Sequence, residues 1–115
     1  MVIAAVGERT IPRPMSTPPQ RIPPEMSPES IGRRLRLIRL AHGLRPAQIS
    51  DMLGIERTYW SRFEGGRRAP SVEFACLLTA RFGVTLDYLY LGREAGLPLE
   101  LAERLRAAAA QSDQD

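Results

Sequence analysis

One short stretch of this chain has the residue types and spacing needed to read the edges of base pairs. If residues 56–64 form a helix, one face of it carries Arg57, Thr58, Ser61 and Arg62. An arginine can donate two hydrogen bonds to O6 and N7 of guanine, and the shorter hydroxyl side chains suit a thymine methyl group or a water-bridged base edge. These four residues are our candidates for contact with bases of double-stranded DNA.

Catalytic and metal chemistry have little support in the sequence. The chain has one histidine, His42, and one cysteine, Cys76. One of each cannot supply a tetrahedral Cys/His metal cluster or a disulfide framework, and no motif around His42 suggests a Ser-His-Asp triad. We therefore expect no enzyme, no cofactor and no metal. His42 is expected to complement the dipole at a helix C-terminus, and Cys76 to be a small buried apolar residue.

The positive charge is concentrated in the middle of the chain. Sixteen arginines stand against thirteen acidic residues, which gives a formal net charge of +3. Residues 30–92 hold ten of the arginines and five of the acids, and this excess attracts a polyanion. Because no apolar run is long enough for a signal peptide or a membrane span, we expect a cytoplasmic protein.

Proline divides the chain into regions. Seven of the ten prolines precede residue 30. Because proline fixes φ and lacks a backbone N–H, residues 1–29 are predicted to be a disordered arm, in which Met15 or Met26 could be the true start. Residues 30–92 have helical spacing and are predicted to form one domain. Residues 93–115 are predicted to form a C-terminal helix and a flexible tail.

Caps and helix-breaking residues predict five helices in the central domain. The expected helices are 31–42 after Ser30, 46–53 with Pro46 in its first turn, 57–64 after Glu56, a fourth helix that Pro70-Ser71 opens and Gly83 closes, and a short helix after Thr85. No segment alternates at period two for long enough to predict a strand. The predicted fold class is therefore all-α.

The spacing of apolar residues predicts which helix faces are buried. In the first helix Ile31, Leu35 and Ile38 form the buried stripe. The residues expected to lie away from it are Arg33, Arg34 and Arg36. The other residues expected to point inward are Ile49, Met52 and Leu53, then Trp60 and Phe63, then Val72, Ala75, Cys76, Leu78, Thr79 and Phe82, and finally Leu86 and Leu89.

The second and third predicted helices, joined by a tight glycine turn, form a helix-turn-helix arrangement. The third would fit the major groove of DNA while the second braces it across the backbone. Residues 31–92 also resemble the phage-repressor (Cro/XRE-like) helix-turn-helix family. The resemblance rests, in chain order, on Leu35, Arg39, Leu44, Gly54, Arg62 with Glu64, Gly66-Arg67-Arg68 with Pro70-Ser71, and the stretch Gly83-Val84-Thr85-Leu86-Asp87-Tyr88-Leu89.

This resemblance implies a five-helix lambda-repressor-like domain that binds a pseudo-palindromic operator as a homodimer. It also implies a protein of a bacterium or a phage that is associated with the nucleoid. It implies an ion pair between Arg39 and Glu64 that ties the first helix to the end of the third, and hence a structural role for Glu64. It also implies that the loop after the third helix follows the DNA backbone. The residues we expect at phosphates are Arg45, Tyr59, Arg67 and Arg68.

The chain departs from the family pattern at three places. Arg45-Pro46 stands where many members have Ser-Gln, so the phosphate contact of that glutamine is lost unless Arg45 replaces it. Glu56 stands at a cap that is usually Ser or Thr; it could accept a hydrogen bond from cytosine N4 or could weaken binding. Trp60 replaces a smaller aliphatic residue and is expected in the core.

A further helix is predicted over 98–110, from Pro98 at its start and the Leu101 and Leu105 spacing. Leu37 and Leu40 lie off the core stripe of the first helix. We hypothesise that the C-terminal helix covers these two leucines or forms a dimer seam, and it is also a candidate surface for a protein partner.

Two functions follow from these patterns. The first is a sequence-specific DNA-binding transcriptional regulator, expected to be a repressor. The alternative is a protein-interaction module, such as an antitoxin or a mobile-element adaptor, that keeps the fold with little DNA binding; Pro46 and Glu56 favour it. Salt distinguishes the two, because contacts with several phosphates weaken steeply as salt rises whereas an apolar protein contact does not.

Overall fold

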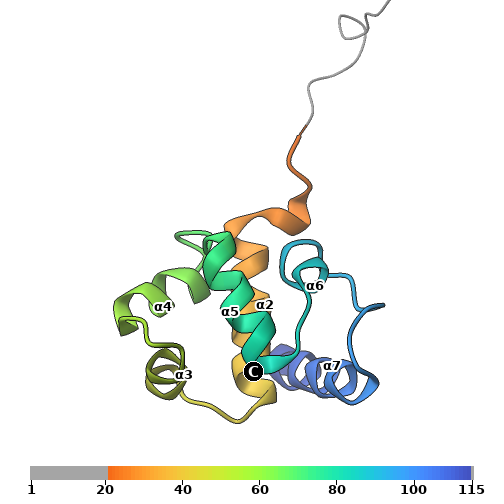
Figure 1. The fold of residues 1–115 in the computed structure, drawn as a ribbon. Helices are drawn as coiled ribbons and strands as arrows, with labels where there is room; N and C mark the ends of the chain where they lie inside the picture. Colours follow the sequence, from red (N-terminus) through yellow and green to blue (C-terminus); the bar gives the residue numbers. More distant parts are fainter. Residues whose placement is uncertain (1–20, 115) are drawn as a thin grey trace, which may run out of the picture.

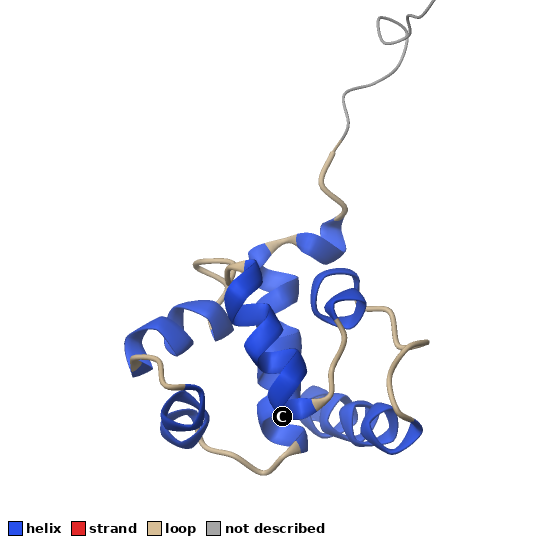
Figure 2. Ribbon diagram, viewed as in Figure 1, coloured by secondary structure: helices blue, strands red, loops and turns tan. Residues whose placement is uncertain are grey.

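A computed structural model describes residues 21–114, and within them the chain is helical with no strand (Figure 1, Figure 2). The elements are the 3₁₀ turn η1 (Pro24–Met26) and the helices α2 (Pro28–Ala41), α3 (Pro46–Leu53), α4 (Arg57–Glu64), α5 (Val72–Phe82), α6 (Leu86–Leu91) and α7 (Leu99–Gln114). The predicted five-helix domain with an extra C-terminal helix is confirmed. Among the described residues, none of the helices could span a lipid bilayer.

Helix α2 begins before its predicted start. Its N-cap is Ser27, whose Oγ accepts a hydrogen bond from the N–H of Ser30 at 3.1 Å. Pro28 follows in the first turn, where its missing N–H costs nothing. The prediction that Ser30 caps this helix is therefore wrong, and residues 24–29 fold although we expected them in the arm. The rest of the predicted arm, residues 1–20, lies outside the described residues.

Helix α2 is the element on which most others pack. It contacts η1, α4, α6 and α7, and in Figure 1 α3 and α4 lie on one side of it while α6 and α7 lie on the other. Its predicted stripe of Ile31, Leu35 and Ile38 is fully buried. The core therefore forms around α2, as the spacing indicated.

The buried face of α5 differs from the predicted one. Phe74, Ala75 and Leu78 are buried, whereas Val72 is 64% exposed and Cys76 is exposed. The predictions for Val72 and Cys76 are wrong because the large ring of Phe74 fixes the rotation of α5, and a helix cannot bury both faces here. Other residues expected inside but found exposed are Met52 and Leu86.

Arg34 is also placed differently from the prediction. Its side chain is buried, and its Nη1 donates a hydrogen bond of 2.7 Å to the carbonyl oxygen of Leu89. The last carbonyls of α6 lack partners within the helix, and a cation at a helix C-terminus is favourable. Burial is the main cause that lowers the pKa of the Arg34 guanidinium. Arg34 therefore joins α2 to α6 and does not belong to a solvated face.

Helix α7 packs against α2 with an aliphatic face. Leu101, Leu105 and Ala108 are buried in this contact. The helix covers Leu37, which is 4% exposed, while Leu40 remains 37% exposed. The hypothesis that the C-terminal helix covers both leucines thus holds for Leu37 and only in part for Leu40, which faces α7 across a hollow; the alternative, a dimer seam, stays a prediction.

Candidate nucleic-acid interface

Helices α3 and α4 are joined by a tight turn. Gly54 ends α3 with φ of +70°, a left-handed conformation that glycine adopts without steric cost. The N–H of Ile55 then donates to the carbonyl oxygen of Ser50 at 3.1 Å. The chain therefore reverses between Gly54 and Glu56, and α4 begins directly beside the end of α3.

Helix α4 has two chemically distinct faces. Trp60 and Phe63 are buried and pack against Phe74, with ring centroids 6.2 Å and 4.9 Å from it. The opposite side of the helix is exposed, and it carries all the residues that we singled out for contact with bases, Arg57, Thr58, Ser61 and Arg62. The structure thus brings these four side chains together on one accessible surface.

A largely buried ion pair fixes α4 to α2. Arg39 Nη2 lies 2.7 Å from Glu64 Oε1, and Arg39 Nε donates to Glu64 Oε2 at 3.0 Å. The indole N–H of Trp60 donates to the same Oε2. The two charged side chains are only 11% and 15% exposed. Both oxygens of Glu64 are used within the protein, which makes its role structural, and Trp60 joins the ion pair that the family resemblance implies.

Gly32 lets α2 approach the C-terminal end of α4. A Cβ atom at this position would lie 2.5 Å from the carbonyl oxygen of Phe63 and 2.7 Å from that of Glu64. Atoms at such distances clash, so no larger residue fits without a shift of backbone. This close contact, together with the ion pair, sets the position from which α4 presents its exposed face.

Cationic and aromatic side chains lie beside the exposed face of α4. The guanidinium carbon of Arg68 lies 5.8 Å from the centroid of the Tyr59 ring, a cation–π geometry that places this pair beside α4. Arg67 is exposed in the same loop, and Arg45 is exposed at the start of α3. Every residue that we expected at DNA phosphates is therefore accessible to solvent.

Sequence reasoning missed Arg36 as a candidate for contact with DNA. A hollow of about 280 Å³ is lined by Arg36, Pro46, Trp60, Ser61, Glu64 and Gly65. Arg36 therefore borders the first turn of α3 and the exposed face of α4, and it forms no ion pair with any described residue. The sequence did hold a signal for this position. Arg39 was expected to pair with Glu64 on α4, and Arg36 precedes Arg39 by three residues, which places the two side chains on the same side of α2.

Two acidic residues lie at the same surface. Glu56 is the N-cap of α4, but its side chain accepts no capping hydrogen bond. Asp51, on α3, places Oδ2 3.3 Å from Nη2 of Arg57. The contact between Asp51 and Arg57 was not predicted from the sequence. A signal was present, because a residue in the last turn of one helix lies near the first residue of the next when three residues join them.

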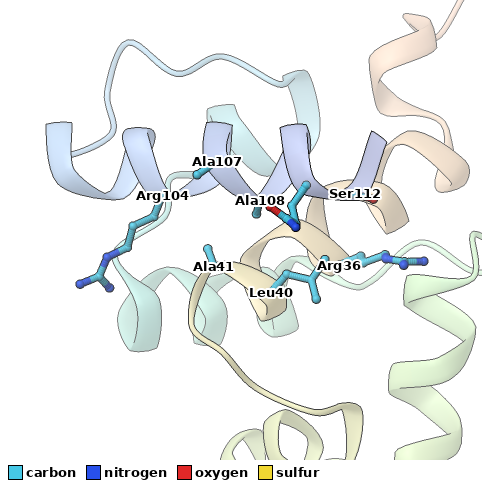
Figure 3. Close-up of a pocket in the computed structure, with 8 residues that line it drawn as sticks. Arg36, Leu40, Ala41, Arg104, Ala107, Ala108 and Ser112 are labelled. Atoms are coloured by element: carbon cyan, nitrogen blue, oxygen red, sulfur yellow. The ribbon is translucent and has the colours of Figure 1, made fainter. Parts of the chain in front are cut away.

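A second hollow lies between α2 and α7, beside the place where the two helices pack (Figure 3). It has a volume of about 410 Å³ and is lined by Arg36, Leu40, Ala41, Arg104, Ala107, Ala108, Gln111 and Ser112. In Figure 3, Leu40 and Ala41 face Ala107 and Ala108, and an arginine lies at each end. Within residues 21–114 no group of three or more His, Cys, Asp or Glu side chains is placed to hold a metal ion.

Comparison with known proteins links this geometry to a family. Residues 30–89 match the helix-turn-helix domain family. Over 69 residues, 60% of this chain, the sequence is 30% identical to the SPbeta prophage-derived uncharacterized HTH-type transcriptional regulator YonR of Bacillus subtilis (strain 168). The match spans 64% of the length of that relative. No solved structure matches the chain significantly.

Proposed function

The chain belongs to the helix-turn-helix domain family, and from this premise we propose that it is a transcriptional regulator that reads double-stranded DNA in a sequence-specific manner. The strongest support is the division of α4, in which Trp60 and Phe63 fix the helix while the opposite face presents polar side chains to solvent. The similarity to a protein named as an HTH-type transcriptional regulator also supports this function.

In this proposal α4 enters the major groove, which is wide enough to accept a helix. Arg57 and Arg62 donate to guanine, and Thr58 and Ser61 contact thymine methyl groups or bound water. The residues that contact the phosphates are Arg45, Tyr59, Arg67 and Arg68, which set the register and most of the affinity without selecting sequence.

We further propose that the protein acts in the cytoplasm, at the nucleoid, as a homodimeric repressor. The family resemblance supports two-fold symmetry, because two copies of α4 would then meet two half-sites about one helical turn apart. A dimer bound across a promoter blocks it by occupancy, so repression requires no contact beyond the DNA.

Selection from a random pool of DNA duplexes at two salt concentrations tests this function. We expect enrichment of a motif with two related halves, and weaker retention of all duplexes at the higher salt. Sedimentation with and without the enriched duplex gives the number of chains bound. Retention without any enriched motif would contradict sequence-specific reading.

The hollow between α2 and α7 favours a second candidate function, a protein-interaction module. Its floor is aliphatic, Leu40 is 37% exposed there, and Arg36 and Arg104 line it. A partner helix with an apolar face and an acidic residue at each end would complement this surface. If this is the main function, duplex DNA should bind weakly even at low salt, and selection should return no motif.

A further inference from the structure

Arg57 is the one arginine on the exposed face of α4, or in the loop after it, that has a carboxylate partner among the described residues. Its Nη2 lies 3.3 Å from Asp51 Oδ2, with the two side chains 68% and 64% exposed. Arg62, Arg67 and Arg68 form no such pair within the described part of the chain. The contact joins α3 to α4 directly on the surface that we assign to DNA.

The ion pair between Asp51 and Arg57 is too exposed to contribute much to the stability of the fold. Exposed ion pairs contribute little to folding because water and salt screen them and two flexible side chains must be held in one geometry. The effect of the contact on geometry is larger. A guanidinium has five N–H donors in a rigid plane, so a carboxylate bound through Nη2 restricts the plane and leaves further donors free.

The free donors are of the kind that guanine requires. Reading a guanine takes two N–H groups aimed at O6 and N7, and an arginine already held in one orientation has less freedom to lose on binding. The carboxylate also repels phosphates of every sequence equally. That repulsion lowers the affinity for all sequences alike, so any gain in discrimination must come from the orientation that Asp51 gives to Arg57.

We propose that Asp51 is a positioning residue that orients Arg57 and thereby determines specificity for a guanine on the DNA. This inference rests on the proposed function and adds a residue that the helix-turn-helix pattern does not mark. Asp51 contacts no base itself. It acts through Arg57, and it lowers the affinity of the protein for random DNA while raising discrimination at one base pair.

The test compares binding of the enriched duplex with binding of duplexes changed at the base pair whose preference Arg57→Ala relaxes. Asp51→Ala, at an exposed helix position where alanine is favourable, is expected to bind random duplex more tightly. Its discrimination at that base pair should fall by roughly two- to five-fold, the range that corresponds to the coupling of an exposed pair. Asp51→Glu keeps the carboxylate and should restore part of the discrimination.

Glu56→Gln is the matched control. It removes one negative charge from the same surface, and Glu56 has no ion pair with any described residue. Random-duplex affinity should rise as it does for Asp51→Ala, but discrimination at the Arg57 base pair should not change. In the Arg57→Ala background, Asp51→Ala should have no further effect on discrimination.

The outcomes separate this inference from the proposed function. If the unaltered chain enriches a motif and Asp51→Ala keeps full discrimination, the inference is wrong and the function stands. A rise in discrimination would show that Asp51 competes with the base for Arg57, and it too would overturn the inference. If the unaltered chain enriches no motif, the proposed function itself fails, and the inference fails with it.

Discussion

Helices α4 and α7 both pack on α2, but they do so with different chemistry. The contact with α4 has a largely buried ion pair, which the indole N–H of Trp60 joins, and a close backbone approach at Gly32. The contact with α7 is made by leucine and alanine side chains, its ion pair, Arg33 with Asp113, is exposed, and a hollow remains beside it. Directional contacts allow few orientations, whereas aliphatic packing tolerates several. The contacts of α4 therefore fix its orientation on α2, whereas the packing of α7 mainly stabilises the fold.

The largest expected effect comes from breaking the ion pair beneath α4. Glu64→Gln leaves the Arg39 cation buried without a counter-charge, and the free energy of unfolding should fall by about 3–5 kcal/mol, as for other buried pairs. Urea denaturation measures the loss. Asp113→Asn, which removes a partner from the exposed pair that Arg33 forms between α2 and α7, is the control and should change stability by well under about 1 kcal/mol. Equal losses would refute the contrast between the two contacts.

The next effect lies in the contact between α2 and α7. Leu105 is fully buried, and Leu105→Ala should lower the free energy of unfolding by about 3 kcal/mol through lost burial and the cavity that remains. Leu99 is 71% exposed on the same helix, so Leu99→Ala serves as the control and should have little effect. DNA affinity of the folded Leu105→Ala protein should be unchanged, and a loss would show that α7 takes part in reading.

A smaller effect is expected on the exposed face of α4. Arg57→Ala should leave the midpoint of urea denaturation unchanged but cost about 1–3 kcal/mol of discrimination at one base pair. Arg67→Ala, the matched loop variant, should weaken binding to all sequences alike and reduce the salt slope by about one. Competition binding with changed duplexes distinguishes the two patterns. The same uniform loss in both variants would contradict base reading by Arg57.

The smallest effect concerns α6, the third helix against α2. Burial raises the pKa of Tyr88 to about 12, above its usual value near 10. Because the unfolded chain releases this proton first, stability is fully present below about pH 10 and is lost as pH rises toward 12; between pH 9 and 11 the loss is about 1 kcal/mol. Tyr88→Phe should remove this part of the pH dependence. An unchanged profile in that variant would show that Tyr88 is not responsible.

The sequence predicted best where single residues control the backbone. Pro46 and Gly54 bound α3, and the glycines after Glu64 end α4, because proline and glycine act locally. The same local reasoning placed Trp60 and Phe63 inside and the base-reading candidates outside. The pair of Arg39 and Glu64 came from the family resemblance, since 25 residues separate its members.

Predictions failed where distant contacts decide between local alternatives. Helix α5 is apolar on more than one side, and the packing of Phe74 against Phe63, not periodicity, selects the buried face. Arg34 is buried because it reaches the carbonyl oxygen of Leu89, 55 residues away. In both cases the deciding partner belongs to another helix, so no local pattern could reveal it.

The most direct test of the account is an NMR titration of the ¹⁵N-labelled protein with the duplex enriched from the random pool. We predict the largest amide shifts at Arg45, along residues 57–62 and at Arg67 and Arg68, with little change in α7. Shifts concentrated around Leu40 and Ala107, with α4 unaffected, would contradict the claim that α4 reads DNA.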